Sequence, residues 1–235
     1  MTDHKIVSRE EWNTARQQFL AKEKEFTRLR DELSRERREL PWERVDKHYA
    51  FDTSAGRESL SDLFAGRQQL IVYHFMFAPD WEVGCKSCSF WADNFNGITD
   101  HLNARDVSLV AISRAPLKTL QAFQQRLGWS FKWVSSVDND FNFAYRVSFT
   151  PDEVAQGEAI YNYAKRRIAS SDLPGISVFL KDEHGDIFHT YSCYARGLDM
   201  FNTAYHLLDI APKGRDEADL PFSMAWVKFR DQYGS

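Results

Sequence analysis

An alternation of buried strands and helices in the middle of the chain limits the folds open to it more than any other pattern. The apolar, β-rich runs at 70–77 and 107–113 suit strands covered on both faces. Helical patterns follow at 89–104 and at 116–127, the second bounded by a proline and a glycine. Strands joined by right-handed helical crossovers run parallel. The sequence therefore predicts an α/β domain.

Beyond this alternation the pattern predicts a hairpin and a closing helix. Residues 176–180 and 187–191 are strand-like and are separated by a turn at 183–186, so we expect an antiparallel pair. A helix is expected at about 198–208. The aromatic, irregular stretch at about 129–170 is predicted to be an insertion of short strands or helical turns.

The N-terminal segment predicts a long charged helix. Ser8 and Glu11 have the spacing of a capping box, and Pro41 ends the pattern. Large apolar residues recur every seven positions: Trp12, Phe19, Phe26, Leu33 and Leu40. This stripe either packs on the body of the same chain or forms a homodimer contact. The predicted organisation is a helical arm at 1–41, a domain at 42–217 and a tail at 218–235.

Composition narrows the classes of partner. The chain has 235 residues, of which 43% are hydrophobic, and a net charge of −4, which argues against affinity for nucleic acid or an anionic membrane. The longest apolar stretch, at 70–79, is about half the length that crosses a bilayer. Residues 1–8 lack an apolar export core, so a cytosolic protein is expected.

The motif that carries chemistry is the C-x-x-C sequence from Cys85 to Cys88. It lies just after the strand at 70–77 and just before a helix, where two thiols three positions apart can close a small disulfide. Unpaired amides at a helix start favour the thiolate of Cys85, and Lys86 adds a nearby cation. Because the thiolate is the reactive form, the placement predicts a redox-active dithiol.

Other readings of a C-x-x-C pair remain open on spacing alone. A zinc site needs a second Cys or His pair, and the chain offers only the distant Cys193 and scattered histidines. Haem attachment needs a histidine where Ser89 stands. The sequence therefore disfavours a metal site or a chance spacing of the two cysteines, but it excludes neither.

Several motifs together resemble a known family. They are Tyr73-His74-Phe75-Met76-Phe77, Asp80-Trp81-Glu82, Gly84-Cys85, Cys88-Ser89-Phe90-Trp91-Ala92-Asp93, Ser113-Arg114-Ala115-Pro116, His189-Thr190-Tyr191 and Arg196-Gly197-Leu198-Asp199. The chain resembles, over about 8–217, a bacterial family of thioredoxin-like proteins of unknown function, described as predicted dithiol-disulfide oxidoreductases. The resemblance implies a thioredoxin-like α/β fold with a central mixed sheet, preceded here by the helical arm.

The resemblance also implies roles for three residues. Cys85 would be the attacking thiol and Cys88 the resolving one, and Pro174 falls where thioredoxin-like proteins keep a cis proline that faces the dithiol and docks the substrate backbone. Two departures matter. Thioredoxin has Trp before its first cysteine and Gly-Pro between the pair, so its redox potential does not transfer. Peroxiredoxins have a threonine where Glu82 stands here.

Further candidates lie near the dithiol in the expected fold. Arg114 follows the strand at 107–113 at its carboxyl end, so it is a candidate to lower the thiol pKa or hold an anionic substrate. Trp81 is a candidate wall of the site. The simpler interpretation for His74, Trp91 and Cys193 is burial in the core.

The sequence thus predicts a dithiol-disulfide oxidoreductase that exchanges with a disulfide-containing substrate and is reset by an external thiol reductant. No bound organic cofactor or metal is implied, because the electrons reside on the two sulfurs. The alternatives are a thiol peroxidase with Cys85 as the peroxide-reactive cysteine, and a non-catalytic metal-binding or interaction module on the same fold.

Overall fold

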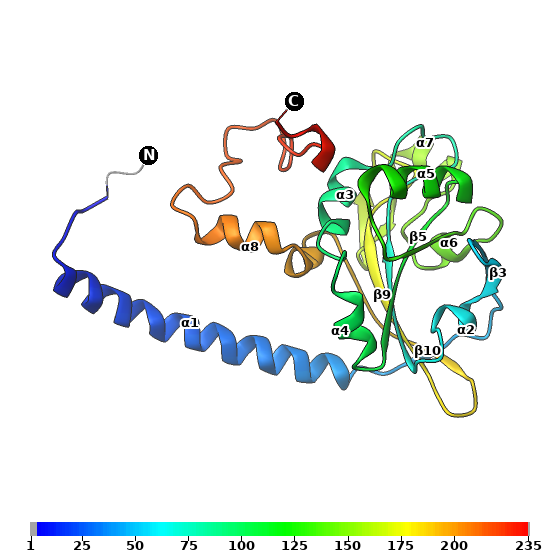
Figure 1. Cartoon of the computed structure of the whole chain (residues 1–235), viewed down its shortest axis with the longest axis horizontal. Helices are drawn as coiled ribbons and strands as arrows, with labels where there is room; N and C mark the ends of the chain where they lie inside the picture. Colours follow the sequence, from blue (N-terminus) through cyan, green and yellow to red (C-terminus); the bar gives the residue numbers. More distant parts are fainter. Residues whose placement is uncertain (1–3, 235) are drawn as a thin grey trace. The chain divides into compact units, whose positions relative to one another are not determined.

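The computed structural model describes residues 4–234, which form two compact units that divide between Pro41 and Trp42 (Figure 1). None of the helices in this range combines the length and the apolar character that crossing a bilayer requires.

The first unit is built on one helix, α1 (Arg9–Arg38). The Ser8 hydroxyl accepts from the Glu11 amide and the Glu11 carboxylate accepts from the Ser8 amide, so the predicted capping box is present. Arginines in the last turn complement the negative end of the helix dipole. The apolar stripe of Trp12, Phe19, Phe26, Leu33 and Leu40 is exposed, and its role in dimer formation stays a prediction.

The second unit is organised on an eight-stranded mixed sheet in the order β1-β10-β9-β4-β5-β6-β2-β3. The strands are β1 (Glu43–Arg44), β2 (Ala50–Thr53), β3 (Gly56–Ser59), β4 (Gln69–His74), β5 (Val107–Ser113), β6 (Lys132–Ser135), β9 (Gly175–Lys181) and β10 (Ile187–Tyr194). Strands β4, β5 and β6 are parallel, β9 pairs antiparallel with β4, and β10 pairs antiparallel with β9. The predicted hairpin and the central parallel strands are therefore present.

Helices cover both faces of this sheet. They are α2 (Leu60–Leu63), α3 (Lys86–Ala92), α4 (Thr99–Asn103), α5 (Leu117–Leu127), α6 (Phe141–Ala144), α7 (Pro151–Gln156) and α8 (Thr203–Ile210), with the short 3-10 helices η1 (Ala195–Phe201) and η2 (Arg230–Gln232). Alternation along β4 sends Tyr73 into a core shared with α3 and α5, and Val72 into a second core shared with α2 and α6. This arrangement is a thioredoxin-like fold.

Four details differ from the sequence-based expectations. The helix expected at 89–104 is two helices, α3 and α4, with Gly97 at φ +87° between them. Within the predicted insertion, β6 joins the central sheet, and the remainder holds α6, α7 and the hairpin β7 (Glu158–Tyr161) and β8 (Ala164–Arg167). The closing helix is η1 followed by α8.

The fourth difference concerns the C-terminal segment, which was expected to be a tail. Val227 is buried, the Phe229 ring lies 5.4 Å from that of Phe123, and Asp231 pairs with Arg126. These contacts fix the segment to the second unit beside α3 and α5. About half of the residues at 218–235 are hydrophobic or aromatic, and these side chains dock the segment although its described part, 218–234, forms no long helix or strand.

Candidate active site

Cys85 is placed by the chain that leaves β4 and enters α3. Its amide donates to the carbonyl of Met76 over 3.1 Å, and its own carbonyl accepts from the Ser89 amide over 3.0 Å in the first helical turn. Cys85 is the N-cap of α3, and its sulfur accepts from the Cys88 amide over 3.4 Å. A sulfur thus takes the place that a serine or aspartate oxygen usually holds at a helix start.

The residue before the motif must be small. A Cβ added at Gly84 would lie 2.8 Å from Cε1 of Phe75 and 3.1 Å from Cδ1 of Phe77. The loop therefore presses on the aromatic core here, and the tryptophan found at this position in thioredoxin would not fit.

The two thiols are chemically unequal. The Cys88 thiol, its amide and the Ser87 amide and hydroxyl donate to the Cys85 sulfur, which lowers the pKa of Cys85 from 9.0 to about 7 in spite of its burial. Burial, reinforced by the neighbouring Cys85 sulfur, raises the pKa of Cys88 well above its ordinary value. Both cysteines are free thiols here. At neutral pH the first proton therefore leaves Cys85.

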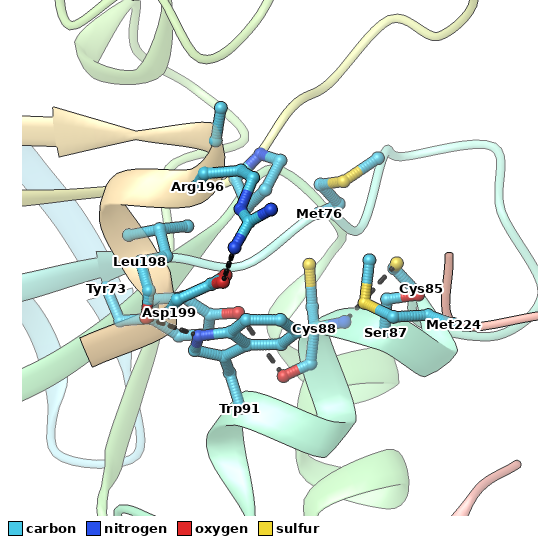
Figure 2. A pocket seen from close by; sticks show the side chains of 12 residues that line it. Tyr73, Met76, Cys85, Ser87, Cys88, Trp91, Arg196, Leu198, Asp199 and Met224 are labelled. Carbon is cyan, nitrogen blue, oxygen red and sulfur yellow. Dashed lines mark hydrogen bonds and ion pairs between the residues drawn. The ribbon is translucent and has the colours of Figure 1, made fainter. Parts of the chain in front are cut away.

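Both cysteines open onto a cavity of about 390 Å³ (Figure 2). Its lining comprises Tyr73, Met76, Cys85, Ser87, Cys88, Trp91, Pro174, Ala195, Arg196, Leu198, Asp199 and Met224. In Figure 2 the ion pair between Arg196 and Asp199 lies on the other side of Cys88 from Cys85. The attacking and resolving sulfurs predicted from sequence thus share one cavity.

Pro174 lines the same cavity, at the entry to β9. The sequence comparison led us to expect a cis proline, whereas residues 4–234 contain no cis peptide bond. Pro174 is therefore a trans proline that faces the dithiol.

Of the two tryptophans near the motif, Trp91 is buried in the core as expected and also lines the cavity, whereas Trp81 does not line it. Trp91 lines the cavity, and its indole N–H donates to the Leu198 carbonyl over 2.7 Å. Trp81, expected as a wall, is absent from the lining and packs half-buried against the core. The α3 helix begins three residues earlier than expected, at Lys86.

Arg114 does not line the cysteine cavity. Its guanidinium makes two hydrogen bonds to the Asp172 carboxylate, at 2.9 and 3.1 Å, and lies over the Phe143 ring. It lines a second cavity together with Pro79 and Asp80. The predicted role in lowering the thiol pKa or holding an anion at the dithiol is therefore wrong, because the buried carboxylate of Asp172, just after the insertion, lies within reach of this arginine.

Replacing Arg114 by alanine is expected to destabilise the protein without changing Cys85. The Asp172 side chain is only 5% exposed, so its charge would be left buried and unpaired, at a cost of about 3 to 5 kcal/mol in the free energy of unfolding. Urea unfolding measures this loss. Arg126→Ala, which breaks a half-exposed pair with Asp231, is the matched control and should cost about 1 kcal/mol or less. A slower Cys85 alkylation with unchanged stability would contradict this assignment.

His74 lies on the sheet face opposite the dithiol. Its Nε2 is 2.8 Å from the Ser177 hydroxyl, which is 2.8 Å from the Ser192 hydroxyl, which in turn is 2.7 Å from Nε2 of His189. Burial lowers the pKa of His74 from 6.5 to about 3. The ring is therefore a neutral core histidine, as expected from sequence, and has no contact with the cysteines. Cys193 is likewise buried.

The buried His74 predicts a stability that falls in mild acid. The unfolded chain binds a proton near pH 6.5 and the folded chain only near pH 3, so this contribution is complete above pH 6.5 and is lost as pH falls toward 3. Between pH 7 and 5 the free energy of unfolding should fall by about 2 kcal/mol from this group. In His74→Gln that decrement should vanish, whereas the exposed His184→Gln control should retain it. Equal pH dependence in all three proteins would contradict the prediction.

Several lining residues escaped the sequence analysis. Ser87 lies inside the motif, and its hydroxyl adjoins the Cys85 sulfur, so the motif itself was the available signal. Arg196, Leu198 and Asp199 stand in the run that carries the family resemblance. Met224 was missed because residues 218–235 were predicted to be a tail, outside the domain that carries the cysteines. Within residues 4–234 no three His, Cys, Asp or Glu side chains group as a metal site would require.

The mixed sheet, with a C-x-x-C pair in the first turn of the helix that follows β4, defines a thioredoxin-like protein with two free thiols in one cavity. The chain belongs to the family described as bacterial protein of unknown function (DUF899), whose model matches residues 1–233. No curated protein matches the sequence significantly.

Solved structures similar to the chain include three peroxiredoxins. A cysteine mutant of peroxiredoxin Q from Xanthomonas campestris is 15% identical, with a TM-score of 0.44 over 67% of this chain and 90% of that chain. The peroxidoxin BcpB from Mycobacterium tuberculosis is 13% identical, with a TM-score of 0.46 over 69% and 90%. A yeast mitochondrial 1-Cys peroxiredoxin is 16% identical, with a TM-score of 0.40 over 68% and 73%.

Proposed function

We propose that the protein is a dithiol-disulfide oxidoreductase in which Cys85 attacks and Cys88 resolves. The observation that carries this proposal is the inequality of the two thiols. Cys85 is partly buried with a pKa lowered to about 7, whereas Cys88, three residues on, is fully buried with a raised pKa. A nucleophile that is ionised at neutral pH beside a thiol that keeps its proton suits stepwise exchange.

In the first step the Cys85 thiolate attacks one sulfur of a substrate disulfide. A bond forms between Cys85 and that sulfur, the substrate S–S bond breaks, and the other half leaves as a thiolate that takes a proton from water. The Cys88 thiol, which had donated to the Cys85 sulfur, loses its anionic partner in this step. The contribution of the Cys85 sulfur to the raised pKa of Cys88 is thereby removed, and the contribution of burial remains.

In the second step Cys88 gives its proton to water in the cavity and attacks the Cys85 sulfur. The Cys85–Cys88 disulfide forms, the mixed disulfide breaks, and the second substrate thiolate leaves. Two electrons have then moved from the protein to the substrate. An external thiol reductant must return two electrons to the pair, which fits a reducing compartment such as the cytosol.

A thiol peroxidase is the competing function, and the surroundings of Cys85 argue for disulfide exchange. The groups that donate to its sulfur come from its own turn, from Ser87 and Cys88. The arginine predicted from sequence, Arg114, pairs with Asp172 outside the cavity, and the arginine in the lining, Arg196, pairs with Asp199. Transition-state charge on a departing peroxide oxygen would have few donors in this cavity.

The test is turnover of the purified reduced protein with a disulfide and a thiol reductant, in parallel with trapping of sulfenic acid at micromolar peroxide. We expect disulfide exchange to be the faster reaction of Cys85. Sulfenic acid that forms faster than the mixed disulfide would favour the peroxidase instead. If neither reaction occurs, the proposal is wrong, and a non-catalytic binding module is the alternative that remains.

A further inference from the structure

We infer that the cavity beside Cys85 selects a small substrate that carries an apolar group next to the atom that Cys85 attacks. This inference rests on the proposed function, and it names the substrate class of the same site.

The inner walls of the cavity offer hydrocarbon rather than hydrogen bonds. Tyr73, Trp91 and Leu198 are each less than one-tenth exposed. Their polar atoms are used inside the protein: the Tyr73 hydroxyl donates to the Cys88 carbonyl over 3.3 Å, and the Trp91 indole donates to the Leu198 carbonyl over 2.7 Å. A polar substrate group placed here would lose its water without gaining partners.

Charge is confined to one side of the cavity and is already paired. The Arg196 guanidinium lies 3.0 Å from the Asp199 carboxylate, and the Arg196 side chain is 86% exposed. Asp199 also pairs with Arg215 at 3.1 Å, and Arg215 pairs in turn with Asp209 at 2.7 Å, so two carboxylates balance the two arginines. These groups leave little net charge to attract an ionic substrate, so the apolar walls dominate the selection.

The size and position of the cavity favour a small molecule over a peptide. Its volume of about 390 Å³ lies at the lower end of small-molecule sites. The β4 strand that leads to the motif is paired with β5 on one side and β9 on the other, so it offers no free edge to which an extended peptide could add.

The wall contributed by the C-terminal segment is held in place. The Glu217 carboxylate accepts from the Met224 amide over 3.0 Å, the Trp226 indole over 2.6 Å and the Tyr205 hydroxyl over 2.8 Å. The Trp226 ring packs edge-on against Phe90 of α3, with centroids 5.5 Å apart. Met224 is therefore a fixed side of the cavity, and binding an apolar group there needs no rearrangement.

The first test measures alkylation of Cys85 and needs no turnover. The rate constants with N-cyclohexylmaleimide and N-ethylmaleimide are compared, and their ratio is divided by the same ratio for glutathione. Because both reagents meet the same thiolate, the pKa cancels. We expect a normalised preference of about tenfold for the cyclohexyl reagent. A normalised ratio near one would overturn the inference.

Two methionine variants locate the preference. Met224→Gln keeps the length of the side chain but makes this wall polar, and it should lower the normalised ratio about threefold or more. Met200→Gln is the matched control, since Met200 is exposed and outside the lining, and it should leave the ratio unchanged. If both variants lower the normalised ratio equally, or if neither changes it, Met224 does not form a selective wall.

The second test identifies the substrate source. Dipropyl disulfide and bis(2-hydroxyethyl) disulfide have similar size and differ in polarity, and insulin supplies a protein disulfide. We expect dipropyl disulfide to react about tenfold faster than the hydroxyethyl compound after normalisation to glutathione. Faster reduction of insulin than of either would overturn the choice of a small substrate. If the maleimide preference holds while no disulfide turns over, the proposed function fails and the apolar selection stands.

Discussion

Replacement of Cys85 by serine is expected to lower disulfide turnover by on the order of a thousandfold or more. The reason is that a serine hydroxyl stays protonated at neutral pH, whereas the pKa of Cys85 is lowered to about 7. Steady-state reduction of dipropyl disulfide, followed through consumption of the thiol reductant, measures the loss.

The third cysteine provides the control for this experiment. Cys193 is buried and lies outside the lining of the cavity, so Cys193→Ala should retain turnover close to that of the unmodified protein. The fold of Cys85→Ser is checked by urea unfolding, which should change little because serine is a preferred N-cap residue and its hydroxyl can accept from the Cys88 amide in place of the sulfur. Turnover that survives in Cys85→Ser, or disappears equally in Cys193→Ala, would rule out Cys85 as the nucleophile.

Replacement of Cys88 by alanine should separate the two chemical steps. Cys85 still attacks, but nothing in the chain releases the product, so the mixed disulfide accumulates at one adduct per chain. Turnover is expected to fall by on the order of a hundredfold or more, limited by attack of the external thiol. Mass spectrometry of the intact protein after mixing with disulfide reveals the adduct.

The same variant also tests what lowers the pKa of Cys85. Cys88 supplies the largest stabilising interaction of the Cys85 thiolate, so losing its thiol should raise the pKa of Cys85. Alanine keeps the amide contribution and is tolerated in the apolar core where Cys88 lies. Full turnover without adduct in Cys88→Ala would mean that resolution does not use this residue.

Local signals explain why much of the fold follows from sequence. The Ser8 capping box, the helix α5 that ends at Gly128 in the left-handed conformation, and the apolar β5 are each specified by residues within their own span. The C-x-x-C pair could likewise be predicted as the reactive part of the site, because both cysteines and Ser87 lie within one helical turn.

The sequence-based predictions of the site were wrong or incomplete where a side chain is positioned by a segment far away in the chain. Arg114 was assigned to the dithiol because the carboxyl edge of a parallel sheet gathers such residues, but Asp172, fifty-eight positions later in the chain, captures it. Met224 joins the cavity only because Glu217 and Trp226 fix its segment beside α3. Neither long-range contact leaves a periodic pattern in the sequence.

The difference between the two thiols is tested most directly by the pH dependence of alkylation at each cysteine. The reduced protein is treated with iodoacetamide from pH 5 to 10, and labelling of Cys85 and Cys88 is followed separately by peptide mass spectrometry. The structure predicts that the Cys85 rate reaches half its plateau at about pH 7, while Cys88 stays unlabelled through that range. A Cys85 midpoint near pH 9, or equal labelling of the two residues, would contradict it.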